Sequence, residues 1–481
     1  MSPRFSCACL AATLAFCAAA RAADGDLDAT FGSAGKVQLG PNTGFSGPVA
    51  NDVAVQPDGK IVVVGYETNA TDGLESWRIA RLNANGTVDT SFASNGMLDW
   101  NAGTTGTRAH AVAVRPDGRI VVGGNFQSEI EVAQFTPNGS PDPTFAGGEG
   151  YILLTPPAGD SNYLSRLVLD TDGSIDIAGT YYANQSGFNS NEFFFDRIAA
   201  NGSSDEPFRY SFGSGPNQDA HATDLAIDSQ GRYVVVGYAP GANGYDCAVI
   251  RITRDLYDVD RTFHYQDPDN YGFTIMPFDL GGDDNDVCNA VAIFPGGYIA
   301  IGGHATANAS NGSYQAAVLA ELDNNGIPDQ YYQDQIGYPA KFSFSYSLNP
   351  TSGQTNDITK LIVDGYDSKY AQLVAIGTGN QYAPPPGTYF GVARLNPAQS
   401  YSNFSLDTAL NGKGVMGVYF AQRPTGLGNF ITTNTGQSGT FVGGKLIAVG
   451  STQATDGHTL AATRLATFDG IFKNGFETPS Y

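Results

Sequence analysis

Polar residues recur just before a series of short apolar segments, and their side chains could bind a ligand. They are Asn51, Asp52, His110, His221, Asp224, Asp286, Asn289, Asn356 and Asp357. Amides, carboxylates and imidazoles of this kind bind a small molecule or an ion when a fold gathers them around the mouth of one cavity. The same residue types also satisfy backbone groups at the start of a strand, so the pattern leaves both roles open.

Two acidic loops have the side chains that calcium prefers. The first, DTDGSID, contains Asp170, Asp172 and Asp176, and the second, GGDDNDV, contains Asp283, Asp284 and Asp286. Carboxylates in a glycine-bearing loop are hard oxygen donors for Ca²⁺, although neither loop reproduces a complete calcium-binding motif. Asp172 and Gly173 also fall where other copies of a repeat have a turn. Calcium is the metal that the sequence suggests, and a turn is the alternative explanation.

Motifs of the common catalytic mechanisms are absent from the sequence. The five histidines form no HExxH pattern, and GQSGT at 436–440 lacks the spacing of a GxSxG nucleophile. The glycine pairs precede no expected helix, so they predict no phosphate-binding loop. Carboxylate pairs for glycoside cleavage cannot be recognised among 47 Asp and Glu residues. We therefore expect a non-catalytic role and keep an enzyme as the alternative.

A repeated segment must position the polar residues. VAVQPDGKIVVVG at 53–65 returns as VAVRPDGRIVVGG at 112–124 and in five more degraded copies that begin at Leu167, Leu225, Val291, Leu361 and Val442. Each copy alternates apolar and polar residues, turns at a Pro-Asp-Gly type of sequence and continues as an apolar run. This pattern predicts a hairpin whose second strand is buried on both faces. Segments such as WRIARLNANGTVDTSF at 77–92 predict two further strands in each repeat of about 60 residues.

Seven four-stranded antiparallel units with both faces covered predict an all-β fold, a seven-bladed β-propeller. The segment DLDATFGSAGKV at 26–37 matches TVDTSFASNGML at 87–98, which contains the expected fourth strand of the first repeat. The last repeat stops before its own fourth strand. An N-terminal strand that completes the last blade would close the ring and leave no open edge. The polar residues that precede each first strand would then surround the mouth of the central channel.

DLDATFGSAGKV, AVQPDGKIVVVG and ARLNANGTVDTSF resemble the delta-60 repeat family of uncharacterised bacterial β-propellers. The resemblance implies a secreted or cell-surface bacterial protein, and it brings no established activity, cofactor or catalytic residue. IFKNGFE at 471–477 resembles a short C-terminal tail motif of exported bacterial proteins.

The N-terminus predicts export. Arg4 precedes an apolar run at 7–20, and Ala20-Arg21-Ala22 offers a signal peptidase site. We expect a signal peptide at 1–22, a propeller at 23–470 and a tail at 471–481. No other apolar stretch is long enough for a transmembrane helix, so the mature protein is expected in the periplasm, at the cell surface or outside the cell. Cys247 and Cys288 remain after cleavage, either as a disulfide or as two buried thiols.

The net charge of −22 disfavours nucleic acids and anionic lipids as partners. Aromatic loops at 181–195, 270–280 and 381–391 suit sugar faces or partner surfaces, and equally suit packing between blades. The first hypothesis is an exported, monomeric, non-catalytic propeller that binds a partner protein or a surface glycan through its loop rim. A polysaccharide hydrolase or lyase with its site at the channel mouth is the second, and a structural surface module is the third.

Overall fold

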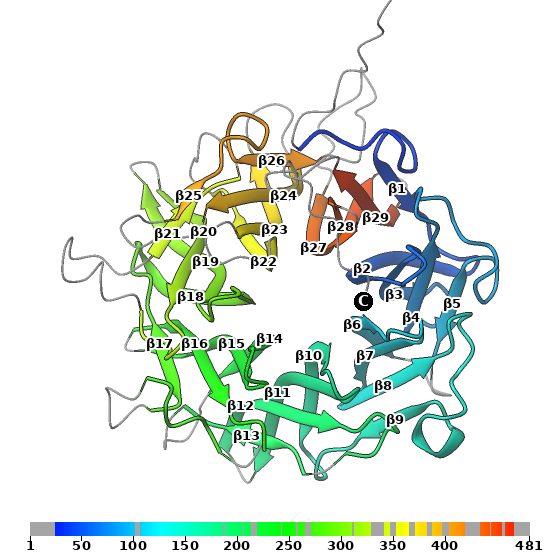
Figure 1. Cartoon of the computed structure of the whole chain (residues 1–481), viewed down its shortest axis with the longest axis horizontal. Coiled ribbons are helices and arrows are strands. Elements are labelled where there is room, and N and C mark those ends of the chain that lie inside the picture. Colours follow the sequence, from blue (N-terminus) through cyan, green and yellow to red (C-terminus); the bar gives the residue numbers. More distant parts are fainter. Residues whose placement is uncertain are drawn as a thin grey trace, which may run out of the picture.

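The chain forms seven antiparallel β-sheets, the blades, around a central axis (Figure 1). This is the seven-bladed β-propeller that the repeats predict. The computed structural model describes residues 25–101, 106–185, 188–204, 206–212, 219–241, 243–255, 258–264, 271–309, 312–328, 341–346, 353–364, 371–381, 387–396, 404–418, 433–442, 444–454 and 457–465. The expected signal peptide and C-terminal tail lie outside these residues. Within them, no helix has the length and apolarity needed to cross a bilayer.

Each blade runs from an innermost strand at the axis to an outermost strand at the rim. Blade 1 contains β2 (Phe45–Val55), β3 (Ile61–Asn69), β4 (Glu75–Leu82) and β5 (Met97–Trp100), and blade 2 contains β6 (Thr107–Val114), β7 (Ile120–Phe126), β8 (Glu129–Phe135) and β9 (Tyr151–Leu154). Blade 3 contains β10 (Ser161–Leu169), β11 (Ile175–Gln185), β12 (Phe188–Ile198) and β13 (Phe208–Tyr210). Blade 4 contains β14 (His221–Ile227), β15 (Tyr233–Pro240), β16 (Tyr245–Ile252) and β17 (Phe273–Met276).

The remaining blades keep this order with one addition. Blade 5 contains β18 (Gly281–Ile293), β19 (Ile299–Ala309), β20 (Gly312–Leu322) and β21 (Lys341–Phe344). Blade 6 contains β22 (Asn356–Asp364), β23 (Gln372–Gln381), β24 (Gly387–Asn396) and β25 (Ser405–Leu406), and β26 (Val415–Val418) also pairs with β24. Blade 7 contains β27 (Thr433–Val442), β28 (Lys445–Ala454), β29 (Gly457–Leu465) and β1 (Lys36–Leu39).

The second strand of a blade is buried on both faces because a neighbouring blade covers each face. In β3, Ile61 and Val63 pack into a core shared with blade 7, whereas Val62 and Val64 pack into a core shared with blade 2. All four side chains are at most 1% exposed. The apolar runs of the repeat therefore form the cores between adjacent blades.

The N-terminal strand closes the ring. β1 pairs with β29 from Lys36 opposite Thr463 to Leu39 opposite Leu460, and Figure 1 shows the blue β1 beside the red β29. Phe31 and Leu39 are buried in the core between blades 7 and 1. The two ends of the described chain thus share one sheet, as the match between 26–37 and 87–98 predicts.

A recurring arginine cluster, here called the blade clamp, holds the segment before the outermost strand. In blade 7, Arg464 Nε donates to Asp28 Oδ2 at 2.8 Å and Nη2 donates to Thr30 Oγ1 at 3.1 Å. Its guanidinium lies 4.7 Å from the centre of the Phe31 ring, and Nη1 donates to the carbonyl of Ala84 in blade 1. Blades 1 and 4 repeat the clamp with Arg81, Asp89, Ser91 and Phe92 and with Arg251, Asp260, Thr262 and Phe263.

Candidate functional site

All seven innermost strands contain a β-bulge at the same position, and the bulges surround the axis. The pairing register with the second strand shifts there by one residue in each blade. The additional residues are Asn51, His110, Ser165, Thr223, Asn289, Thr359 and Gln437. A bulge leaves its extra residue outside the ladder and redirects the side chain. The fold therefore places seven polar residues, one from each blade, around the channel.

The bulge also explains the glycine that ends the repeated segment. A Cβ on Gly65 would collide with the carbonyl oxygen of Val49, and a Cβ on Gly237 would collide with that of His221. Both glycines lie directly opposite the residue before a bulge, where the distorted strand comes closest. Only glycine leaves room for this approach.

Several bulge side chains connect one blade to the next by hydrogen bonds. The donors and acceptors are Asn51 Nδ2 to Ala109 O at 2.7 Å, Ser165 Oγ to Ala222 O at 2.7 Å, Thr223 Oγ1 to Cys288 O at 2.7 Å and Thr359 Oγ1 to Gly436 O at 3.0 Å. Each acceptor is the residue before the bulge of the following blade. These bonds stabilise the ring around its axis, which is the structural role that such residues can have without any ligand.

The channel mouth holds a cavity of about 700 Å³ to which every blade contributes. Six of the polar residues predicted from the sequence line it, namely Asn51, His110, His221, Asp224, Asn289 and Asp357. Of the other three, Asp52 lies against the cavity floor, where it binds Arg166 and Ser438. Asp286 accepts hydrogen bonds from the backbone of Phe278 and Asp279, and Asn356 accepts one from the backbone of Tyr346, so both satisfy loops away from the cavity.

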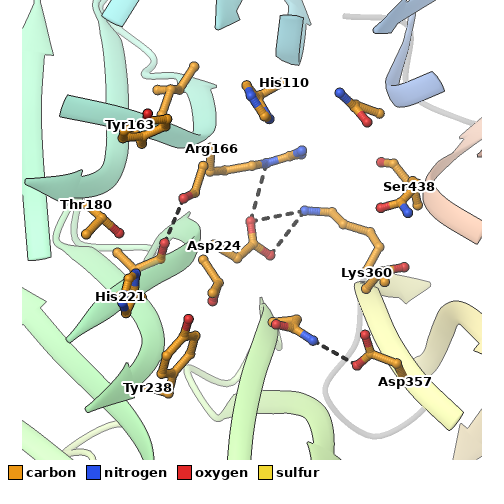
Figure 2. A pocket seen from close by; sticks show the side chains of 18 of the residues that line it. His110, Tyr163, Arg166, Thr180, His221, Asp224, Tyr238, Asp357, Lys360 and Ser438 are labelled. Atoms are coloured by element: carbon orange, nitrogen blue, oxygen red, sulfur yellow. Dashed lines mark hydrogen bonds and ion pairs between the residues drawn. The ribbon is translucent and has the colours of Figure 1, made fainter. Parts of the chain in front are cut away.

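The floor of the cavity is a chain of four alternating charges, and Figure 2 shows three of them, Arg166, Asp224 and Lys360. Arg166 Nη1 donates to Asp52 Oδ2 at 2.9 Å, and Arg166 Nε lies 3.4 Å from Asp224 Oδ1. Lys360 Nζ reaches the same Asp224 carboxylate from blade 6, at 3.3 Å from Oδ2. Burial, together with the charge of Arg166, lowers the pKa of Lys360. Two cations from blades 3 and 6 thus meet over one buried carboxylate.

His221 lies in the aromatic wall of the cavity and is held from both ring nitrogens. Nε2 is 2.8 Å from Asp219 Oδ1, and Nδ1 is 3.3 Å from the Tyr182 hydroxyl. Burial raises the pKa of Tyr182 to about 12, so its hydroxyl keeps the proton. The ionised Asp219 carboxylate can only accept, so Nε2 donates the hydrogen bond that joins the two residues. Burial alone would raise the pKa of Asp219, but hydrogen bonds from Tyr245, His221 and Asn191 lower it.

Tyrosine rings extend this wall. Tyr238 stacks on His221 with ring centres 4.9 Å apart, and Tyr163 meets Tyr182 edge to face at 5.1 Å. Tyr163 is 42% exposed, so one large ring remains open to the solvent beside the cavity. The neighbouring Phe193 to Phe195 are buried between blades and do not extend the wall.

The remaining predicted residues on the rim are held by neighbours. Asp357 Oδ1 accepts from Asn289 Nδ2 at 2.8 Å and lies 2.9 Å from His304 Nδ1. Asn125 Oδ1 accepts the backbone N–H of Leu164, so its amide nitrogen donates to His110 Nε2 at 3.1 Å. Burial and the charge of Arg108 lower the pKa of His110 to about 4, and its imidazole is neutral at physiological pH.

Sequence reasoning missed the two floor cations as well as Tyr163 and Tyr238, whereas Tyr182 lies in the aromatic segment 181–195 that the sequence singles out. A signal for the cations existed, because Arg166 and Lys360 stand directly before Leu167 and Leu361, as Asp52 stands before Val53. Aligning all seven copies on that position would have found them. Tyr163 and Tyr238 have no comparable signal, because Tyr163 lies on the first strand of blade 3 and Tyr238 near the end of the second strand of blade 4.

In the first acidic loop a protein cation lies among the carboxylates. Arg197 Nη2 lies 2.9 Å from Asp170 Oδ2 and also pairs with Asp172, and its Nε lies 3.8 Å from Asp176 Oδ1. In the second loop, Asp283 accepts from the backbone of Asn285. In the described part of the chain, no group of three or more His, Cys, Asp or Glu is placed to hold a metal ion. Calcium binding at either loop stays a prediction from the sequence.

Cys247 on β16 and Cys288 on β18 form a disulfide between blades 4 and 5. Cys288 directly precedes the bulge residue Asn289, so the bond anchors one side of the cavity rim to the neighbouring blade. Thr223 of blade 4 binds the Cys288 carbonyl at the same place.

The comparison with protein families agrees with the fold. Residues 56–92 and 115–145 match a family described as a β-propeller domain of unknown function, DUF5122, which supports an uncharacterised propeller family. No curated protein matches the chain. Similar solved structures include a Lactobacillus plantarum protein at 11% identity, covering 77% of this chain and 88% of that one with a TM-score of 0.38. Likenesses of this degree concern the fold alone.

Two carbohydrate-active enzymes are among the similar structures. An ulvan lyase of polysaccharide lyase family PL25 is 11% identical, with 67% of this chain and 75% of that one covered and a TM-score of 0.40. Trypanosoma rangeli sialidase is 10% identical, with 89% of this chain and 55% of that one covered and a TM-score of 0.33. The chain thus spans about half of the sialidase, and neither likeness bears on what the cavity binds.

Proposed function

We propose that the protein binds a carbohydrate in the channel-mouth cavity. The observation that carries the proposal is the exposed ring of Tyr163 beside a cavity lined by amides, hydroxyls and imidazoles from all seven blades. The apolar face of a sugar stacks on such a ring, and its hydroxyl groups need several convergent hydrogen-bonding partners. The cavity volume of about 700 Å³ falls within the range of small-molecule sites, which favours a short glycan over a broad protein surface.

Glycan-array screening followed by titration of the strongest hit tests this proposal. Tyr163→Ala is expected to weaken binding about tenfold, because it removes a stacking surface of hot-spot type. Tyr298→Ala is the matched control, since Tyr298 is 43% exposed and does not line the cavity. Equal loss in both variants, or binding that Tyr163→Ala leaves intact, contradicts the assignment of the cavity.

A polysaccharide hydrolase or lyase is the second candidate, because His110, His221 and Asp224 line the same cavity. His221 has the more favourable geometry, with Asp219 orienting Nε2 and the Tyr182 hydroxyl at Nδ1. Because both ring nitrogens are hydrogen-bonded, the Tyr182 hydroxyl is the group that can meet the glycan. It can take a proton from the glycan while it passes its own proton to Nδ1, and the reverse transfer returns a proton, as in general acid–base catalysis.

Product analysis separates the two functions. Catalysis predicts new reducing ends, or an unsaturated product detected by ultraviolet absorbance, when the glycan that binds is incubated with the protein. His221→Ala should then reduce turnover by about a hundredfold or more while the glycan still binds. Binding without any product supports the non-catalytic function.

Export is part of the proposal. The disulfide between Cys247 and Cys288 supports an oxidising compartment, which agrees with a signal peptide at 1–22 and a mature propeller at 23–470. Mass spectrometry of the protein recovered outside the cytoplasm should find Ala23 as its first residue. The same spectrum reports whether the tail at 471–481 is retained. A mature protein that still begins at Met1 contradicts this part of the proposal.

A further inference from the structure

The two cations at the cavity floor are more exposed to the open space than their carboxylate partners, although Asp224 also lines the cavity. The side chains of Arg166 and Lys360 are 19% and 13% exposed, and both residues line the cavity. The Asp52 and Asp224 side chains are only 2% and 3% exposed. A molecule that enters the cavity therefore meets more of the N–H groups of the two cations than of the carboxylate oxygens beneath them. Figure 2 shows both cations extending over Asp224 from opposite sides.

The buried carboxylates already have protein donors. Asp52 accepts from the Ser438 hydroxyl at 2.6 Å and the Val112 N–H at 3.0 Å, in addition to Arg166. Asp224 accepts from the Val291 N–H at 3.1 Å. Both carboxylates thus accept hydrogen bonds from the innermost strand of the next blade. These bonds use part of the capacity of each carboxylate to accept hydrogen bonds.

The two cations, by contrast, have N–H groups without a close acceptor. Lys360 Nζ lies 3.3 and 3.4 Å from the two Asp224 oxygens, and Arg166 Nε lies 3.4 Å from Oδ1. Charge-assisted hydrogen bonds are usually 2.7–2.9 Å long, so these contacts are loose. Arg166 Nε is buried and makes no hydrogen bond to any described residue. An ammonium group has three donors, and one carboxylate at this distance does not satisfy them.

Repulsion between the positive charges of Arg166 and Lys360 adds to this shortage of hydrogen-bond acceptors. The charge of Arg166, after burial itself, lowers the pKa of Lys360. Asp224 and Asp52 offset part of this repulsion, and an additional anion on the cavity side of the two cations would offset more of it. Other acidic groups on the rim do not fill this place, because Asp357 is held by Asn289 and His304.

We propose that the cavity floor is an anion subsite, and that the carbohydrate ligand carries a carboxylate or sulfate group that binds Arg166 and Lys360. The proposal rests on the proposed function for the identity of the ligand as a sugar. The planar guanidinium of Arg166 suits a two-oxygen group, and Lys360 supplies a second positive charge from across the channel. The class of ligand is therefore an acidic sugar, either a uronate or a sulfated residue.

Calorimetric titration at constant ionic strength tests the subsite with four probes: D-glucuronate, D-glucose 6-sulfate, D-glucose and inorganic sulfate. An acidic sugar that fits the subsite is expected to bind the wild-type protein about tenfold more tightly than glucose. Comparing D-glucuronate with D-glucose 6-sulfate shows whether the subsite takes a carboxylate or a sulfate. Lys360→Gln should remove most of this preference, and Lys360→Arg should retain it. Lys413→Gln, which removes an exposed lysine on the outside of blade 6, should have no effect. Thermal melting identifies any variant that fails to fold.

The outcomes separate this inference from the proposed function. Equal binding of glucose and both acidic sugars, or an acidic preference that survives in folded Lys360→Gln, overturns the subsite and leaves carbohydrate binding in place. Sulfate binding that requires Lys360, with no binding of any sugar, supports the subsite and counts against carbohydrate as the ligand. No binding of any probe overturns the anion subsite.

Discussion

One nearly buried carboxylate, that of Asp28, contributes to ring closure, and its removal directly perturbs the fold. Asp28 accepts hydrogen bonds from Arg464 Nε at 2.8 Å, Lys445 Nζ at 2.6 Å and the Thr30 hydroxyl at 2.6 Å. Asp28 is 5% exposed and the Arg464 side chain 10% exposed. Asp28→Ala therefore leaves a nearly buried guanidinium without its ion-pair partner.

The expected cost of Asp28→Ala is about 3–5 kcal/mol of unfolding free energy, because an uncompensated buried charge remains. Lys445 adds little to this figure, since its side chain is 37% exposed and exposed pairs contribute about 1 kcal/mol or less. The loss is a large fraction of the roughly 5–15 kcal/mol that stabilises most domains. Asp58→Ala is the control, because Asp58 forms an exposed pair with Lys60 and should change stability by less than about 1 kcal/mol.

Urea unfolding followed by tryptophan fluorescence measures the cost, and amide hydrogen exchange locates it. In Asp28→Ala, exchange should rise first in β1 and β29, whereas the equivalent clamp variant Asp89→Ala should loosen β4 and β5. An Asp28→Ala protein that unfolds at the urea concentration of wild type refutes the reasoning. So does a loss of protection that is the same in all seven blades.

The remaining predictions concern pH and redox state. Burial alone would raise the pKa of Asp89, but hydrogen bonds from Ser91 and a neighbouring lysine hold it at about 2. The pKa of Asp89 in the folded state lies below its value in the unfolded state, so its stabilising contribution is complete above about pH 4 and is lost towards pH 2. A wild-type urea midpoint that stays constant between pH 4 and pH 2 contradicts the prediction. Burial raises the pKa of Glu131 to about 7, so its ionisation destabilises the folded state increasingly from about pH 4 to pH 7. Glu131→Gln should therefore stabilise the protein by roughly 3 kcal/mol at pH 8 and by almost nothing at pH 4, and an equal gain at both values would exclude this cause. The Cys247–Cys288 disulfide joins residues 41 positions apart, and its reduction should lower the free energy of unfolding by about 4 kcal/mol. Comparing urea unfolding with and without reductant measures this loss. Equal midpoints in the two experiments would show that the bond does not constrain the unfolded chain.

The blades could be predicted because their signals are local. The apolar run after each Pro-Asp-Gly type of turn identifies a buried strand, and Gly59 in the first such turn has the positive φ, 82°, that this sequence predicts. Closure was also predictable, because the segment that ends in β1 repeats the residues that precede β5. The seven bulges were not predicted, because each shifts the apolar–polar alternation by one residue within a strand of 7 to 13 residues, which is too short for the shift to stand out.

The site was predictable only in part because it depends on distances across the ring. His110, His221 and Asp224 reach one cavity because they lie on the innermost strands of blades 2 and 4. The contact of Lys360 with Asp224 instead depends on the channel width, which is set by how seven blades pack together. The partnership of His221 with Tyr182 likewise depends on the angle between blades 3 and 4. No spacing in the sequence encodes these quantities.

A crystal structure of the protein with the glycan that binds most tightly is the most direct test of the channel-mouth site. The account predicts electron density for a sugar ring against Tyr163, with its acidic group at Arg166 and Lys360. Density for the glycan on the outer strands or at the opposite end of the channel, with the cavity unoccupied, would contradict it.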